Sequence, residues 1–118
     1  MQNGTILQCF HWYLPADGKL WNFLQSEAKR LAGMGITAIW VPPASKGSDG
    51  AESVGYDVYD LYDLGEFDQK GSIRTKYGTK EEFVEAVKAI HDAGMQVYVD
   101  VVINHLAGAD ATETIKVR

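Results

Sequence analysis

The residues best suited to chemistry lie in the run 100–105, which reads DVVINH. Asp100 and Asn104 are an even number of positions apart, so their side chains share one face if the run is an extended strand. Carboxylate and amide oxygens are the ligands that calcium prefers. His105 follows at the strand end and can bind a substrate or metal, or simply satisfy its hydrogen bonds at the surface. Zinc is disfavoured, because no second histidine or cysteine lies at ligand spacing.

A second group of candidates lies in the segment 44–78, which is rich in glycine, aromatic and acidic residues. They are Tyr56, Tyr59, Tyr62, Phe67 and Tyr77, with Asp57, Asp60, Asp63, Glu66 and Asp68. Aromatic rings have flat apolar faces and polar edges, which complement the C–H faces and hydroxyl rim of a pyranose. We interpret most of these rings as loop packing and expect one to contact a sugar. Asp57, Asp60 and Asp63 are three residues apart, a spacing that does not match an EF-hand loop.

The elements that must position these groups alternate along the chain. Hydrophobic periodicity predicts strands at 5–11, 37–41 and 96–104 and helices at 19–34 and 79–93. Thr79 and Glu82 fit a capping box at the start of the second helix. Two consecutive βαβ units of this kind imply parallel strands. Functional groups are then expected at the C-terminal ends of the strands.

The third strand indicates which parallel fold is present. Val97, Val99, Val101 and Ile103 share one face, as expected of side chains packed under helices. The opposite face carries Asp100, which is costly to bury in a sheet covered by helices on both sides. Inside a barrel, facing strands can supply hydrogen-bond donors. The pattern therefore favours an α/β barrel over a doubly wound parallel sheet.

Composition excludes several other classes of function. The 118-residue chain has a net charge of −5 and lacks a basic cluster, which argues against nucleic acid and anionic membrane surfaces as partners. No apolar run approaches the ~20 residues of a membrane helix. Cys9 is predicted to pack as a small apolar residue rather than act as a nucleophile with His11. The first residues do not resemble a signal peptide, so we expect a cytoplasmic protein, although a mature secreted chain would look the same.

Several motifs together resemble the alpha-amylase family, glycoside hydrolase family 13. The run 100–105 is similar to the family's first signature region, and 35–43 is similar to its second barrel strand. Residues 55–67, with 76–79 after them, are similar to the loop that follows that strand. Residues 7–13 resemble bacterial alpha-amylases of the liquefying type, particularly their cytoplasmic branch.

The resemblance implies roles for four residues. Tyr56 stacks on the sugar just before the cleaved bond, and His105 hydrogen-bonds hydroxyls of the same sugar. Asn104 is a ligand of a structural calcium. Asp100 is a structural partner of a barrel arginine rather than a catalyst.

The resemblance also implies how the chain is divided and what it does. Residues 1–105 are the N-terminal part of the catalytic (β/α)8 TIM barrel, with its strands 1–3, its helices 1–2 and a long loop after strand 2. Residues 106–118 begin an inserted calcium-binding domain. The parent enzyme hydrolyses internal α-1,4-glucosidic bonds of starch or maltodextrin with retention. Its catalytic carboxylates lie on strands four, five and seven, so this chain alone is expected to lack catalytic residues, to hold an incomplete calcium site and to be inactive. Its open sheet edges predict self-association.

Two alternatives remain at this point. The chain could be a non-catalytic βαβαβ module that binds saccharide weakly through Tyr56 and His105; binding without hydrolysis distinguishes it. A third interpretation keeps catalysis within the chain, using Asp100 with Glu66 or Asp63, and requires a mid-strand carboxylate to reach the substrate.

Overall fold

A computed structural model describes residues 3–117 of the chain. Residues 1, 2 and 118, at the outer ends of the two predicted domain ranges, lie outside the described residues. The elements, in order, are β1 (Ile6–Gln8), α1 (Leu20–Gly33), β2 (Ala38–Val41), β3 (Lys46–Gly47), the 3-10 helix η1 (Gly50–Glu52), β4 (Val58–Asp60), α2 (Lys80–Asp92) and β5 (Gln96–Val99).

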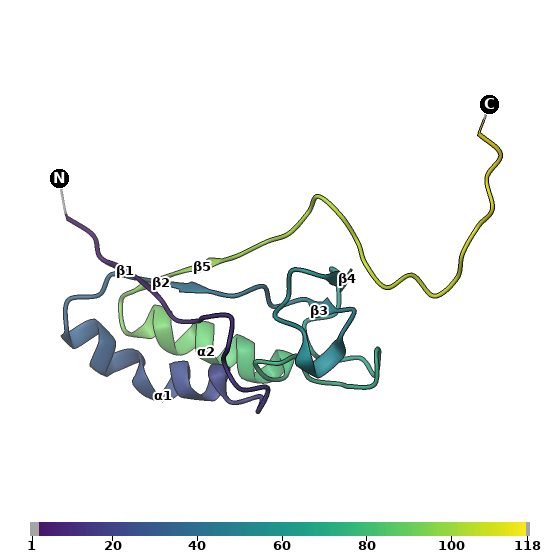
Figure 1. The fold of residues 1–118 in the computed structure, drawn as a ribbon. Helices are drawn as coiled ribbons and strands as arrows, with labels where there is room; N and C mark the ends of the chain where they lie inside the picture. The colour runs from purple at the N-terminus through teal and green to yellow at the C-terminus, as the bar shows by residue number, and fades with distance from the viewer. Residues whose placement is uncertain (1–2, 118) are drawn as a thin grey trace.

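The main sheet is three-stranded and parallel, in the order β1-β2-β5. Each of its two connections contains one α-helix, which confirms the predicted βαβ units. Both helices lie on the same face of the sheet (Figure 1). On the opposite face, Trp40 and Tyr98 are 39% and 51% exposed. A sheet with helices on one face only is the arrangement found in a barrel wall.

The hydrophobic core lies between this sheet and the two helices. It includes Trp21, Leu24, Ala28 and Leu31 from α1, Ala86 and Ile90 from α2, and Ile39 and Val41 from β2. The N-terminus of α2 has the predicted capping box: Thr79 Oγ1 accepts from the Glu82 amide at 3.3 Å, and Glu82 Oε1 accepts from the Thr79 amide at 3.1 Å. This cap satisfies two amides that the first turn would otherwise leave unpaired.

The outer strands are shorter than predicted. The first strand covers 6–8 instead of 5–11, and the third covers 96–99 instead of 96–104. Their length is set by β2, which ends at Val41 before two prolines that cannot donate to a ladder. The last β2–β5 backbone bond joins the Asp100 amide to the Val41 carbonyl, at 3.1 Å. Beyond this bond, residues 101–117 extend away from the parallel sheet (Figure 1).

One predicted face of the third strand is only partly buried. Val97 packs against the core, but Val99, Val101 and Ile103 are 39%, 61% and 81% exposed. The prediction that all four pack under helices is therefore wrong for these three. The reason is topological: α2 precedes β5 and contacts it, and the described part of the chain contains no later helix to cover the rest.

The long segment 44–78 is more regular than the sequence indicated. It contains η1 and a small antiparallel sheet in which β3 pairs with β4. Strands of two and three residues are too short to show an alternating pattern, so periodicity could not predict them. They form a compact subdomain that follows the C-terminal end of β2.

Candidate functional site

A cavity of about 760 Å³ lies beside the C-terminal ends of the parallel strands. Its wall combines rings, carboxylates and an imidazole, which come from Trp12, Tyr13, Asp49, Glu52, Tyr56, Asp57 and His105. The structure thus brings Tyr56 and His105, predicted to bind the same sugar, into one cavity. Trp12 was not among the predicted site residues, although its place just after β1 was a signal for it.

Tyr56 is fixed on two sides. Its hydroxyl donates to Asp100 Oδ2 at 2.8 Å, and its ring lies parallel to that of Trp12, with centroids 6.3 Å apart and planes 2° apart. Burial, together with the hydrogen bond and negative charge of Asp100, raises the pKa of Tyr56 to about 12. The phenol therefore stays protonated and keeps donating at neutral pH. Asp100 thus has a structural partner, here a tyrosine; the predicted arginine stays a prediction.

His105 is held by the backbone of the same loop. Its Nε2 lies 2.8 Å from the carbonyl oxygen of Tyr56. A carbonyl can only accept, so Nε2 carries the proton and donates, and Nδ1 of the neutral ring is left as an acceptor. The side chain is exposed at the cavity. Its Nδ1 can therefore accept a hydrogen bond from a hydroxyl group.

Asp57 organises the cavity wall. Its Oδ2 accepts from the Ser48 hydroxyl at 2.6 Å and from the Asp49 amide at 3.1 Å, while Oδ1 accepts from the Ser53 hydroxyl. Burial acts to raise the pKa of Asp57, but these donors outweigh it and the net pKa is lowered. The carboxylate is ionised and both oxygens are occupied, which suits a structural role rather than that of a proton donor.

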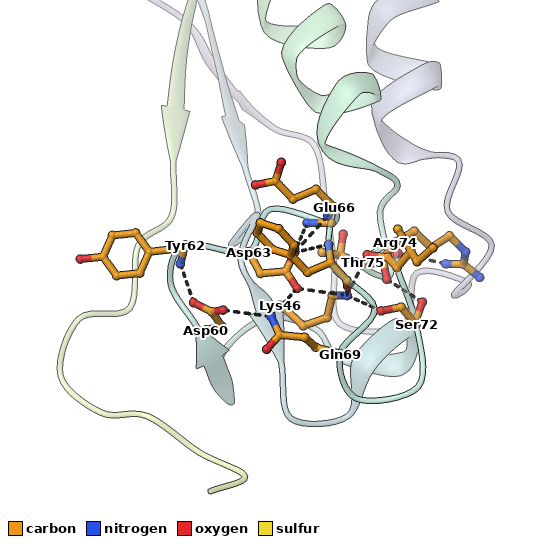
Figure 2. Close-up of polar contacts among 12 residues, drawn as sticks. Lys46, Asp60, Tyr62, Asp63, Glu66, Gln69, Ser72, Arg74 and Thr75 are labelled. Carbon is orange, nitrogen blue, oxygen red and sulfur yellow. Dashed lines mark hydrogen bonds and ion pairs between the residues drawn. The ribbon is translucent and has the colours of Figure 1, made fainter. Parts of the chain in front are cut away.

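The loop that carries Tyr56 and Asp57 is anchored by a buried ion pair (Figure 2). Lys46 Nζ lies 3.3 Å from Asp63 Oδ2, and both side chains are fully buried. The ammonium also donates to three backbone carbonyls, those of Phe67, Ser72 and Ile73. The Gln69 amide group donates to both Asp60 and Asp63.

Asp63 is stabilised as a carboxylate in this buried position. Its Oδ1 accepts from the backbone amides of Gly65, Glu66 and Phe67 at 2.9, 3.0 and 3.3 Å. Burial tends to raise its pKa, but the amides of Glu66 and Gly65 outweigh it, so the net pKa is lowered. The segment 63–73 is thus folded around one charged pair.

This geometry argues against catalysis by Asp100 with Glu66 or Asp63. Asp63 is buried against Lys46, and Glu66 Oε2 is paired with Lys80 Nζ at 2.7 Å. Neither carboxylate lines the cavity that contains Tyr56 and His105.

Asn104 is the residue that was predicted to bind calcium. Asn104 is exposed and offers an amide oxygen, which is a suitable ligand. Among residues 3–117, however, no group of three or more His, Cys, Asp or Glu side chains is placed to hold a metal ion.

Cys9 packs against the core as predicted. Burial raises the pKa of its thiol to about 11, so it stays protonated at neutral pH. His11, the base that a nucleophile would need, accepts from the Tyr13 amide through Nδ1 at 3.2 Å. In the described part of the chain, no helix is long and apolar enough to cross a membrane.

Comparisons with known proteins agree with this architecture. Residues 21–116 match the model of the alpha-amylase catalytic domain. The chain is 59% identical over 113 residues to an alpha-amylase of Geobacillus stearothermophilus, covering 96% of this chain and 20% of that protein. It is 54% identical over 118 residues to the cytoplasmic alpha-amylase of Escherichia coli K12, covering 100% of this chain and 24% of that protein.

Solved structures show the same fold. Alternansucrase in complex with isomaltononaose superimposes with a TM-score of 0.79 at 25% identity, covering 92% of this chain and 10% of that one. The chain spans about a fifth to a quarter of the length of the curated relatives described above. Its parallel sheet and two helices are part of the (β/α)8 TIM-barrel catalytic domain, as predicted, and the chain belongs to the alpha-amylase family.

Proposed function

We propose that this chain is the sugar-binding N-terminal part of an enzyme that hydrolyses internal α-1,4-glucosidic bonds of starch or maltodextrin with retention. Family membership supports this proposal, as do relatives that are named alpha-amylases. The observation that carries it is the cavity in which the Tyr56 ring and the His105 imidazole meet. A ring face beside a hydrogen-bonding edge is a suitable surface for a glucose unit.

In this proposal Tyr56 stacks on the sugar that precedes the cleaved bond. The hydrogen bond from its hydroxyl to Asp100 fixes the plane of the ring, and so reduces the entropy lost when a sugar binds. His105 Nδ1 accepts from a hydroxyl of the same sugar, because Nε2 is bound to the Tyr56 carbonyl. The hydrogen bond from the His105 ring to the backbone carbonyl of Tyr56 thus holds the two residues in a fixed relative position.

The chain is assigned a binding role rather than the chemical step. A retaining glycosidase needs two carboxylates about 5–5.5 Å apart, one as nucleophile and one as acid/base. Of the acidic groups near Tyr56, Asp57 has both oxygens engaged and Asp100 is bonded to the phenol. Asp49 and Glu52 also line the cavity, but the family resemblance implies catalytic carboxylates on strands four, five and seven. We therefore assign the catalytic carboxylates to other strands of the barrel.

The test compares starch hydrolysis by this 118-residue chain with that by a protein that also contains the rest of the catalytic domain, called the complete protein below. We expect hydrolysis only by the complete protein. There, Tyr56→Ala should lower kcat/KM by roughly tenfold or more, since a stacked ring contributes about 0.5–1.5 kcal/mol beyond its buried area.

Tyr62→Ala is the matched control, because Tyr62 is 88% exposed and does not line the cavity. Its kcat/KM should stay close to that of the wild type. Hydrolysis by the short chain, or equal effects of the two substitutions, would contradict the proposal. Maltooligosaccharide binding by the short chain, with no hydrolysis by the complete protein, would instead favour the non-catalytic module.

We also propose that residues 106–118 begin an inserted calcium-binding domain and that Asn104 supplies one ligand to its calcium. Support comes from the exposed amide of Asn104, beside a segment without helix or strand. Asn104→Ala should reduce the stabilisation that calcium gives to the complete protein. Each tenfold loss of affinity removes about 1.4 kcal/mol at saturating calcium.

This is measured as the shift of the unfolding midpoint between calcium and chelator. Asn104→Asp, which keeps an oxygen ligand, is the control and should retain the shift. An undiminished shift in Asn104→Ala would exclude the residue as a ligand.

An alpha-glucan is the partner that this proposal implies. The name of the Escherichia coli relative supports the predicted cytoplasmic location. Self-association of the isolated chain through the open edges of β1 and β5 stays a prediction.

A further inference from the structure

Residues 106–110, called the strap below, run beside β4 and are bound to β4 and to Lys70. The Ala107 amide donates to the Val58 carbonyl at 2.7 Å. Lys70 Nζ donates to the Gly108 carbonyl at 2.6 Å. The Tyr59 hydroxyl donates to Asp110 Oδ2 at 2.6 Å. The strap is therefore docked on the small antiparallel sheet although it has no regular structure of its own.

Lys70 is the centre of these contacts. Its ammonium lies 3.6 Å from Asp110 Oδ1 and 4.3 Å from the centroid of the Tyr59 ring, in addition to its bond to Gly108. The side chain is only 23% exposed. One cation thus contacts a carbonyl, a carboxylate and a ring face, and two of these three groups belong to the strap.

The backbone of Lys70 is also unusual. Its φ of 53° places it in the left-handed region, and among the described residues it is the only residue other than glycine with a positive φ. A glycine would adopt this conformation without strain. A lysine there costs free energy unless its side chain makes compensating contacts. The side-chain contacts of Lys70 with the strap and with the Tyr59 ring can offset this cost.

The strap begins where the proposed sugar site ends. His105 precedes it directly, and both His105 and Ala107 line the cavity. His105 is held on one side by the Tyr56 carbonyl and on the other by the docked strap. If the strap were released, only the first of these constraints would remain.

We infer that Lys70 is a positioning residue: it docks the strap on β4 and thereby fixes His105 at the sugar-binding cavity. This inference rests on the proposed function, in which His105 binds a sugar hydroxyl. Its action is indirect, because Lys70 itself does not line the cavity.

The first readout concerns the strap alone and does not depend on sugar. Lys70→Met keeps the length of the stem and removes the charge, whereas Lys70→Arg keeps a cation. In the complete protein we expect faster hydrogen exchange at the Ala107 amide in Lys70→Met, and nearly wild-type exchange in Lys70→Arg. Lys29→Met, at an exposed lysine of α1, is the control and should change nothing there. Unchanged exchange in Lys70→Met would overturn the inference.

The second readout is a double-mutant cycle on KM for maltooligosaccharide. Lys70→Met should raise KM about three- to tenfold, the range of one hydrogen bond, with a smaller effect on kcat. In a His105→Ala background, Lys70→Met should raise KM little further, because the imidazole that Lys70 positions is absent. An equal increase in both backgrounds would show a general structural effect and overturn the positioning role. If His105→Ala alone left KM unchanged, the proposed sugar contact of His105 would fail, while the exchange data would still report on the strap.

Discussion

Replacing Lys46 by methionine is expected to destabilise the loop 44–78 by about 3–5 kcal/mol, the usual cost of removing one partner from a buried ion pair. Asp63 would remain as a buried carboxylate without its counter-ion, and three carbonyls would lose their donor. Methionine fills most of the space of the lysine stem, so the loss is mainly electrostatic. Asp63→Asn should destabilise the loop in the same way, since it leaves the ammonium unpaired.

Native-state hydrogen exchange of the complete protein measures this effect locally. The Lys46 amide is a direct reporter, because it donates to the Asp63 carbonyl at 2.7 Å. The double variant Lys46→Met/Asp63→Asn should lose less stability than the two single variants lose in sum, since the two charges disappear together. Lys80→Met removes the partner of Glu66 from a pair in which the lysine side chain is 40% exposed, and should change the exchange little. Equal losses of local stability in Lys46→Met and Lys80→Met would contradict the structural role of the buried pair.

The Lys46–Asp63 pair and the Lys70 contacts anchor different parts of the same site. The buried pair holds the segment 63–73 together from inside. Lys70 holds the strap from outside. Tyr56 lies in the loop that the first contact folds, and His105 precedes the strap that the second contact docks. We therefore expect the relative position of the Tyr56 ring and the His105 imidazole to depend on two lysines, neither of which lines the cavity.

The sequence alone was sufficient to predict the helices, the helix cap and the parallel arrangement of the strands. Apolar spacing predicted both helices, the Thr79–Glu82 pair predicted the cap, and the order of elements predicted a parallel sheet. Strand ends were less predictable, because hydrogen-bonding partners determine them. Residues 100–104 have the composition of a strand, but β2 offers no partner after Val41.

The candidate site was predictable only in part. Family motifs indicated Tyr56 and His105, and the structure places both in one cavity. The bond from Tyr56 to Asp100 joins residues 44 positions apart, and no local pattern encodes such a contact. The burial of Lys46 was not predictable for a similar reason: a lysine in a glycine-rich segment resembles a surface residue until its carbonyl partners are known.

Replacing Gly50 is expected to disturb the wall of the cavity. Its φ is +56°, and a Cβ there would overlap the carbonyl oxygen of Lys70. The obstacle is backbone, so a side-chain rotation cannot relieve it. We expect Gly50→Ala to cost about 2–5 kcal/mol: roughly 1–2 for the left-handed conformation and the remainder for the overlap.

Gly71→Ala provides a matched control. Gly71 also has a positive φ, +77°, but a Cβ there would meet no atom within 4 Å. Its cost should be limited to the conformational part, about 1–2 kcal/mol. Hydrogen exchange of the loop 44–78 in the complete protein would compare the two variants, and KM for maltooligosaccharide would show whether the cavity is affected. Equal losses of stability in the two variants would mean that the backbone of Lys70 does not restrict the space at Gly50. A larger cost at Gly50, with a raised KM, would show that this contact connects the wall carrying Asp49 and Glu52 to the residue that docks the strap.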